Sequence, residues 1–210
     1  TNYKPTGLLQ EHGEDTGNRT IRFGLMTGSY AKNKSGGVLR RNVERITGNA
    51  TASKNEIDTS TGLFINQTVN DEGIINTLNR LRISSYSHSA NKYQSGCSSP
   101  GILTFSDGSC VDWGNPLGEM YLEALRYLAG KTSATTAFNA DDSGHITGLS
   151  TVSWSDPMAD GEYCADTSII AISTGLNSFD TDQLTGHGIS GLVVDDQTDA
   201  VGNLEEISNH

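Results

Sequence analysis

Four consecutive apolar residues at positions 169–172 constrain the fold of this chain more than any other feature. Apolar side chains on successive positions are typical of a central β-strand that is covered on both faces of its sheet. A polar stretch follows the strand predicted at 167–174. In open α/β sheets, ligands bind beyond the carboxyl ends of the strands. This pattern therefore suggests a binding site in the segment that follows.

The candidate ligands at this site are hydroxyl, amide and carboxylate side chains: Ser173, Thr174, Asn177, Asp180 and Asp182. Their oxygens suit a hard cation such as Mg²⁺ or Ca²⁺. The alternative is a polar strand-to-helix loop in which Asp180 or Asp182 caps the next element. The sequence leaves both interpretations open.

A second cation pattern lies near the end of the chain, where Asp195, Asp199 and Glu206 occur at spacings that can surround Ca²⁺ in a loop. Ala200 stands where the turn of an EF-hand loop requires glycine. The stretch 139–150 has a similar start but no closing carboxylate. A chain this rich in aspartate and glycine produces such matches by chance.

The remaining pattern predicts two further strands and two helices. Alternation of apolar and polar residues predicts a half-buried strand within 20–28. The stretch 35–46 is interpreted as a turn followed by a second strand. Apolar spacing predicts helices within 70–83, with Asn70 as N-cap, and within 115–131. The polar stretches 47–61, 84–109 and 131–157 are predicted to be loops or insertions. Strands and helices in this order indicate an α/β sheet with helices packed on its faces.

The helix within 115–131 is predicted to belong to the core. Asn115 is a suitable N-cap, and Pro116 fits the first helical position. Its apolar stripe is Leu117, Met120, Tyr121, Ala124, Leu125 and Leu128. Glu119 and Glu123 are interpreted as surface partners of Arg126. The basic cluster Arg40, Arg41 and Arg45 is likewise interpreted as a solvated face.

Composition excludes several classes of function. The formal net charge of −11 disfavours binding to nucleic acid or to anionic lipid. No run of about 18 apolar residues predicts a membrane span. Neither a nucleophile elbow, a C-x-x-C pair nor a phosphate-binding glycine loop is found, and the five histidines lie in polar contexts. We expect the sequence to be a fragment of a longer protein.

The three cysteines indicate an oxidising compartment. Cys97 and Cys110 flank a segment rich in glycine and serine, and we expect them to form a local disulfide. Cys164 is expected to be free or bonded to a cysteine outside this sequence.

Three stretches taken together resemble the PilC/PilY family of type IV pilus proteins. They are "IRFGLMTGSY" with "SGGVLRRN", then "WGNPLGEMYLEALRYLAG", then "SIIAISTGLNSFD". The resemblance runs in a consistent order from about Tyr3 to Leu184. It implies a large exported protein of the pilus tip, with a von Willebrand factor A-like region followed by a C-terminal β-propeller.

On this resemblance, residues 1–210 are one α/β module, a partial von Willebrand factor A-like (Rossmann-like) sheet with long irregular insertions. A loop-rich insertion is expected near 84–112, and the strand at 167–174 becomes a central one. Metal-binding relatives place aspartate after such a strand, whereas this chain has Ser173-Thr174-Gly175. Only Asp180 or Asp182 could replace that carboxylate.

The resemblance implies a non-enzymatic role in pilus assembly, adhesion and twitching motility. The implied partners are minor pilins, the propeller of the same protein, and a host or abiotic surface. The expected location is extracellular, at the pilus tip or bacterial surface. Two alternatives remain open: a secreted hydrolase that uses Asp180 and Asp182, or a carbohydrate-binding module that uses Trp113 or Trp154.

Overall fold

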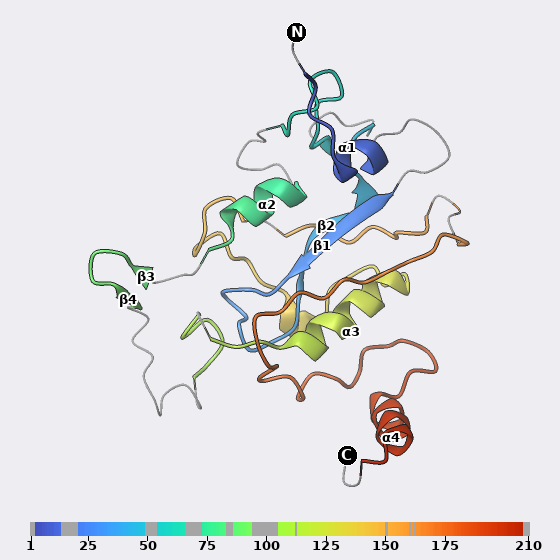
Figure 1. Ribbon diagram of the computed structural model, residues 1–210. Helices are drawn as coiled ribbons and strands as arrows, with labels where there is room; N and C mark the ends of the chain where they lie inside the picture. Colours follow the sequence, from blue (N-terminus) through green and yellow to red (C-terminus); the bar gives the residue numbers. More distant parts are fainter. Residues whose placement is uncertain are drawn as a thin grey trace.

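The computed structural model describes residues 3–13, 21–48, 54–65, 73–82, 86–93, 105–111, 113–149, 151–159, 161 and 163–207. Within them the elements follow the order α1 (Leu8–Gly13), β1 (Arg22–Thr27), β2 (Val38–Arg45), α2 (Ile74–Arg80), β3 (Tyr86–Ser87), β4 (Lys92–Tyr93), α3 (Leu117–Leu128), the 3₁₀ turn η3 (Thr136–Phe138) and α4 (Val194–Leu204). Long irregular segments join these elements (Figure 1).

An antiparallel hairpin of β1 and β2 forms the larger sheet. Both strands were predicted, whereas their antiparallel pairing is a finding of the structure. Its register runs from Arg22 opposite Arg45 to Thr27 opposite Val38, with irregularities on both sides of Leu25. Gly24 lies at the first irregularity, where an added Cβ would come within 2.9 Å of Val43 Cγ2. A residue without a side chain therefore lets the two strands approach closely at the bulge.

Helix α3 packs along the hairpin and contributes Leu122 and Tyr127 to the core. Tyr127 packs with Leu39 and Val152, and its hydroxyl accepts a hydrogen bond from Val43 N at 2.9 Å. The aromatic ring of Trp154 meets Tyr127 edge-on, with 5.4 Å between ring centroids. The helix thus contributes to the core, as predicted, but the predicted apolar stripe is wrong. The buried face of α3 is formed by Glu119, Leu122, Glu123 and Tyr127, whereas the six residues of the stripe are only partly buried or, at Tyr121, exposed.

The segment 131–157 was predicted to be a polar insertion, and this prediction is wrong. Five of its apolar side chains are buried in the core: Phe138, Ala140, Ile146, Leu149 and Val152. The segment also runs along β2, where the Asn42 side chain donates to Ser153 O and accepts from Ser155 N, both at 2.9 Å. Its apolar residues are spaced irregularly, so periodicity could not reveal them.

The prediction of solvated charged residues is also wrong. Arg40 and Arg41 on β2 are 1% and 2% exposed, and Glu119 and Glu123 on α3 are fully buried. Arg40 forms an ion pair with Asp142, and Arg126 donates to Glu123 Oε2 at 3.0 Å. Burial of these charges is tolerated because each has a charged or backbone hydrogen-bond partner elsewhere in the chain.

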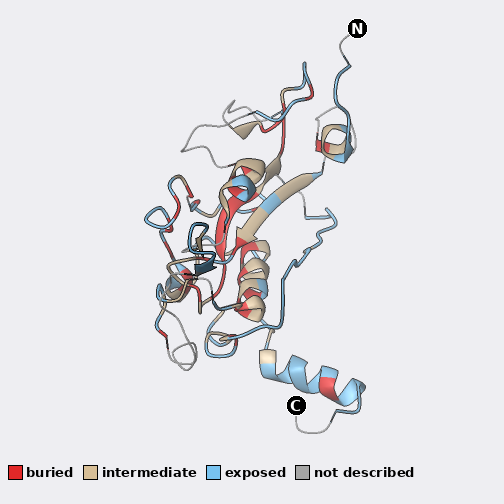
Figure 2. Ribbon diagram, turned by 60° about the vertical axis from the view of Figure 1, so that its left-hand side comes forward, coloured by how far each residue is buried: buried red, intermediate tan, exposed pale blue. Residues whose placement is uncertain are grey.

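The segment predicted as a central buried strand, 167–174, is not assigned as a strand. Ile170 and Ile172 are 85% and 89% exposed. The segment is nevertheless extended, and it runs beside β1 and α3 in the direction of β1 (Figure 1). Figure 2 shows that it belongs to the exposed part of the surface.

The fold is therefore mixed α/β with a small antiparallel sheet, which confirms the coarse fold class. The finer expectations, a von Willebrand factor A-like sheet and a single module, stay predictions. The insertion expected near 84–112 contains the short β3–β4 hairpin, and part of it lies outside the described residues. Asn70 also lies outside them, and its prediction as the N-cap of α2 is wrong, because Gly73 occupies the N-cap position of that helix.

Candidate functional site

The predicted site after residue 174 folds back onto the N-terminus of α3. Asp180 is 7% exposed, and its carboxylate accepts hydrogen bonds from Gly118 N at 2.7 Å and Glu119 N at 2.8 Å. Asn177 Nδ2 donates to the same carboxylate at 2.9 Å. Asp180 therefore satisfies two backbone donors that a helix N-terminus leaves open, and its charge is favourable there.

Gly118 makes this close approach feasible. A Cβ at this position would lie 2.9 Å from Asp180 Oδ2 and 3.1 Å from Oδ1. A side chain at Gly118 would thus push the capping carboxylate away from the helix.

Asn115 was predicted to be the N-cap of α3, and this prediction is wrong in its details: the helix begins after Pro116. The Asn115 side chain instead holds the loop, donating to Ser173 Oγ at 2.9 Å and to Leu176 O at 3.0 Å. Its backbone exchanges hydrogen bonds with Ser178, whose amide donates to Asn115 O at 2.9 Å. The start of α3 and the loop are consequently one hydrogen-bonded unit.

Glu119 lies in the first turn of α3 and is fully buried. Gly36 N donates to its Oε2 at 2.8 Å, and its Oε1 has no hydrogen-bond partner in the described part of the chain. Burial, together with the nearby carboxylates Asp182 and Asp180, raises the pKa of Glu119 to about 7, against the lowering effect of the Gly36 amide. No pattern in the sequence pointed to this residue, because the helical spacing places it on a polar face.

Of the five predicted cation ligands, the structure brings Asn177 and Asp180 together and connects Ser173 to Asn115. Thr174 and Asp182 are exposed, and Asp182 contacts Gln183 Nε2 at 3.5 Å. Across the described ranges, no cluster of three or more His, Cys, Asp or Glu side chains is arranged to hold a metal ion. Asp180 does act as a cap, but of the earlier helix α3 and not of the next element, as the capping alternative expected. Cation binding at this loop stays a prediction.

The second cation pattern does not form the predicted loop. Asp195 and Asp199 lie one turn apart on helix α4, and Glu206 follows the helix in a turn with a φ of 57°. Paired acidic residues in the first turn favour a helix because they interact with its positive end. A calcium loop of the EF-hand type needs these positions to be non-helical.

The cysteines are partly described. Cys164 is exposed and carries a free thiol, and Cys110 is disulfide-bonded. Cys97 lies outside the described residues, so its pairing with Cys110 stays a prediction.

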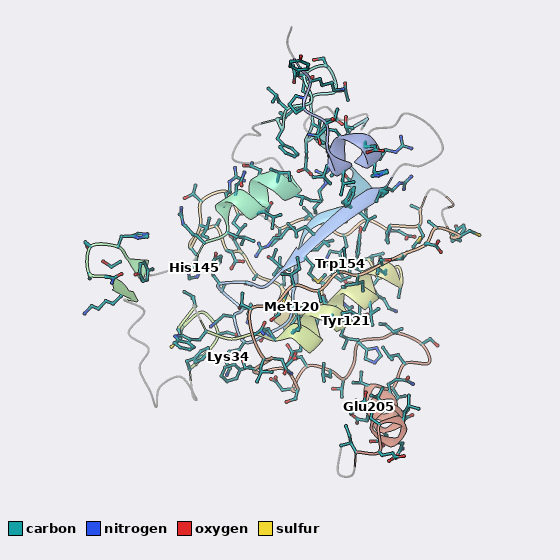
Figure 3. The ribbon with its side chains drawn as sticks, in the orientation of Figure 1. Lys34, Met120, Tyr121, His145, Trp154 and Glu205 are labelled. Carbon is teal, nitrogen blue, oxygen red and sulfur yellow. The ribbon has the colours of Figure 1, made fainter. Side chains whose placement is uncertain are left out.

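The aromatic candidates for sugar binding have different environments. Trp154 packs against Tyr127 and lies 5.6 Å from the Arg126 guanidinium, so its faces are used within the protein. Trp113 is 42% exposed, and its carbonyl accepts from Asn33 Nδ2 at 2.8 Å. Figure 3 shows Trp154 close to α3 in the body of the molecule. Nothing in this geometry favours a stacking platform of both rings.

A family model described as the second domain of PilY1 homologues matches residues 23–210. A type IV pilus biogenesis factor, the PilY1 homologue of Xylella fastidiosa (strain Temecula1), is 36% identical over 148 residues. That match covers 68% of this chain and 9% of the relative. No solved structure matches the chain significantly. Among the described residues, no helix is both long and apolar enough to cross a membrane. The predicted resemblance is confirmed: the chain belongs to the PilY1 homologue family and corresponds to its second domain.

Proposed function

We propose that this chain is a non-enzymatic module of a type IV pilus biogenesis factor, which supports pilus assembly and adhesion by docking to other proteins or to a surface. The family match carries the proposal, together with the name of the relative from Xylella fastidiosa. The proposed location is the pilus tip or the bacterial surface after export. The proposed partners are minor pilins, the propeller of the same protein, and the surface to which the bacterium attaches.

The arrangement of the acidic residues supports a structural role for the predicted site. Both oxygens of Asp180 bind the backbone of α3, and Glu119 is completely buried. A hydrolase needs acidic groups that converge on a cleft open to substrate. These two carboxylates stabilise the helix and the core, and Asp182, near Glu119, is exposed on the surface and does not cap the helix.

Helix α4 is the first surface to test for protein docking. It lies away from the β1–β2 hairpin and is exposed over most of its length (Figures 1 and 2). Val201 and Leu204 are 55% and 84% exposed, on a helix that also carries Asp195, Asp196 and Asp199. An isolated helix of 11 residues is marginal in water, so contact with a partner would stabilise it.

The test uses the full-length parent protein in its own bacterium. An in-frame deletion of the 210 residues is expected to reduce surface pili, measured as pilin released by shearing, and to reduce twitching. The double variant Val201→Asp/Leu204→Asp is expected to reduce pili at an unchanged level of exported protein. Unchanged piliation in the deletion strain would overturn the proposed role.

A pair of substitutions separates docking from catalysis or metal binding at the loop. Asp182→Asn and Thr174→Ala change exposed predicted ligands that have no part in capping α3. We expect both variants to retain normal piliation. Loss of piliation in these variants, with normal export, would instead favour the hydrolase or a functional metal site.

A further inference from the structure

Large apolar side chains are exposed at the end of the molecule where the described chain begins. They come from two segments, 3–8 and 63–65, and each is at least 41% exposed: Tyr3, Leu8, Leu63, Phe64 and Ile65. We call these five residues the N-terminal apolar patch. Both segments lie at the same end of the molecule, far from α4 (Figure 1). Single exposed apolar residues are ordinary, whereas a group of large ones marks an interaction surface.

The two segments that carry the patch are packed against each other. Gln10 on α1 donates from Nε2 to Gly62 O at 3.0 Å. A Cβ added at Gly62 would come within 2.5 Å of Pro5 O, so the backbones of the two segments approach closely there. The segments 3–10 and 62–65, which are distant in the sequence, therefore form one surface.

The loop that presents Leu63, Phe64 and Ile65 is held by its own hydrogen bonds. The carboxylate of Asp58 accepts from Ser60 N at 2.8 Å, and Asp58 N donates to Leu63 O at 2.9 Å. Ile65 N donates to Glu56 O at 2.8 Å, and Glu56 is only 1% exposed. A loop that is already ordered loses little conformational entropy when a partner covers it.

The position of the patch in the parent polypeptide indicates which partner covers it. The chain corresponds to the second domain of its family, so a first domain precedes it in the parent. The family match begins at residue 23, and the segment 3–13 therefore belongs to the junction between the two domains. Tyr3, at 90% exposed, and Leu8 lie on this junction, whereas residues 63–65 belong to the matched domain. The patch thus joins both sides of a domain boundary.

We propose that the N-terminal apolar patch is the contact surface for the first domain of the same polypeptide, which covers these side chains with an apolar face of its own. Interfaces between domains of one chain bury about 600–1,500 Å². Aromatic side chains are favoured at the centre of an interface, so Tyr3 and Phe64 would be its anchors. Such a contact would hold the second domain in a fixed orientation to the first. The proposal rests on family membership and does not depend on docking to pilins.

Other occupants fit these observations less well. The formal net charge of −11 opposes binding of the patch to an anionic lipid surface. A second copy of the chain would lose translational and rotational freedom on binding. The first domain is tethered through the junction, so its effective concentration at the patch is high. The same advantage is denied to a pilin or any other separate chain.

Cross-linking in the full-length parent protein identifies what covers the patch. A photoreactive phenylalanine analogue is placed at Phe64, with the same analogue at Tyr163 as the control, because Tyr163 is 80% exposed and outside the patch. The expected product from Phe64 is an intramolecular link to a peptide that precedes residue 1, absent from the control. A link to a pilin, to lipid, to a second copy or to any other part of the same chain would overturn the proposal, and so would the absence of a product.

Limited proteolysis of the full-length protein tests whether the contact holds the two domains together. The double variant Leu63→Asp/Phe64→Asp places charges in the interface, so cleavage of the junction before residue 23 is expected to become about tenfold faster. Tyr163→Asp is the control and should be cleaved there at the unmodified rate. An unchanged rate in the double variant would overturn the proposal. The cross-linking result does not depend on the folding of this variant. Piliation enters neither readout, so failure here is distinct from failure of the proposed function.

Discussion

Arg40 and Asp142 are 102 residues apart in the sequence and form an ion pair whose side chains are fully buried. Asp142 Oδ1 also accepts from Ser29 Oγ at 2.9 Å and from Ala31 N at 2.8 Å. Arg40 Nε donates to Thr27 Oγ1 at 2.9 Å. The pair thereby connects β2, the end of β1 and the segment after η3.

Asp142→Asn is expected to lower the free energy of unfolding by about 3–5 kcal/mol, because it removes the negative charge that forms a buried ion pair with Arg40. Chemical denaturation monitored by circular dichroism measures the loss. The exposed neighbour Asp141→Asn is the matched control and should change stability little. The double variant Arg40→Met/Asp142→Leu should recover part of the loss; equal effects of the two single aspartate variants would contradict the argument.

Asp180→Ala is expected to destabilise the protein by about 1–2 kcal/mol, since α3 loses its capping carboxylate. Hydrogen exchange should show faster opening confined to the first turn of α3 and the loop 173–178. Asp182→Ala provides the comparison, because its side chain is exposed and does not cap the helix. A larger effect of Asp182→Ala than of Asp180→Ala would show that the cap has been misassigned.

Glu119 should make stability decrease as pH rises. Its pKa is raised from 4.5 to about 7 in the folded protein, so between these values the folded state retains a proton that the unfolded state releases. The stabilising contribution is fully present below pH 4.5 and is lost as pH passes through 7. The Glu119→Gln variant cannot lose a proton, so the decline of the melting temperature between pH 5 and pH 8 should become shallower.

Glu123→Gln is the control for replacing a buried glutamate of the same helix by its amide. Both Glu123 oxygens are bonded, to Thr135 and Arg126, so the amide should lower stability by weakening these bonds. Parallel pH profiles for the wild type and Glu119→Gln would rule out the assigned role of Glu119.

Gly36→Ala should lower the free energy of unfolding by about 1–3 kcal/mol. The added Cβ would come within 2.2 Å of the Phe138 ring, at a backbone φ of 30° that favours glycine. Gly144→Ala is the matched control, since no atom lies within 4 Å of its added Cβ. Thermal unfolding of the two variants compares them directly, and similar melting temperatures would argue against close packing at Gly36.

Thiol labelling of the 210-residue chain tests the cysteine assignments. We expect one reactive thiol without reductant, at Cys164, because that side chain is exposed and free. Two further thiols should react only after reduction and unfolding if Cys97 is bonded to Cys110. Peptide mapping that finds three labelled cysteines before reduction would exclude the predicted disulfide.

Local patterns in the sequence predicted β1, β2, α2 and α3, because alternation and helical spacing reflect which side of an element is apolar. The same patterns misplaced Glu119, Glu123, Arg40 and Arg41 on the surface. A charged side chain is expected to be exposed only when the fold offers it no partner for an ion pair or a hydrogen bond. Their partners, such as Asp142 and Thr135, come from a segment that was interpreted as an insertion.

The sequence by itself determined the family, the coarse α/β class and the main elements around the hairpin and α3. Only the tertiary structure decided what the opening apolar run and its polar loop do. On residue type alone, Asp180 could be a metal ligand or a helix cap. The hydrogen bond that it accepts from the Gly118 amide, 62 residues away, makes it a cap of α3. Residues 169–172 have the pattern of a central strand, yet in these 210 residues they line one wall of an open groove. A hydrophobic pattern specifies that a side chain favours burial, whereas the element that buries it depends on contacts between distant parts of the chain.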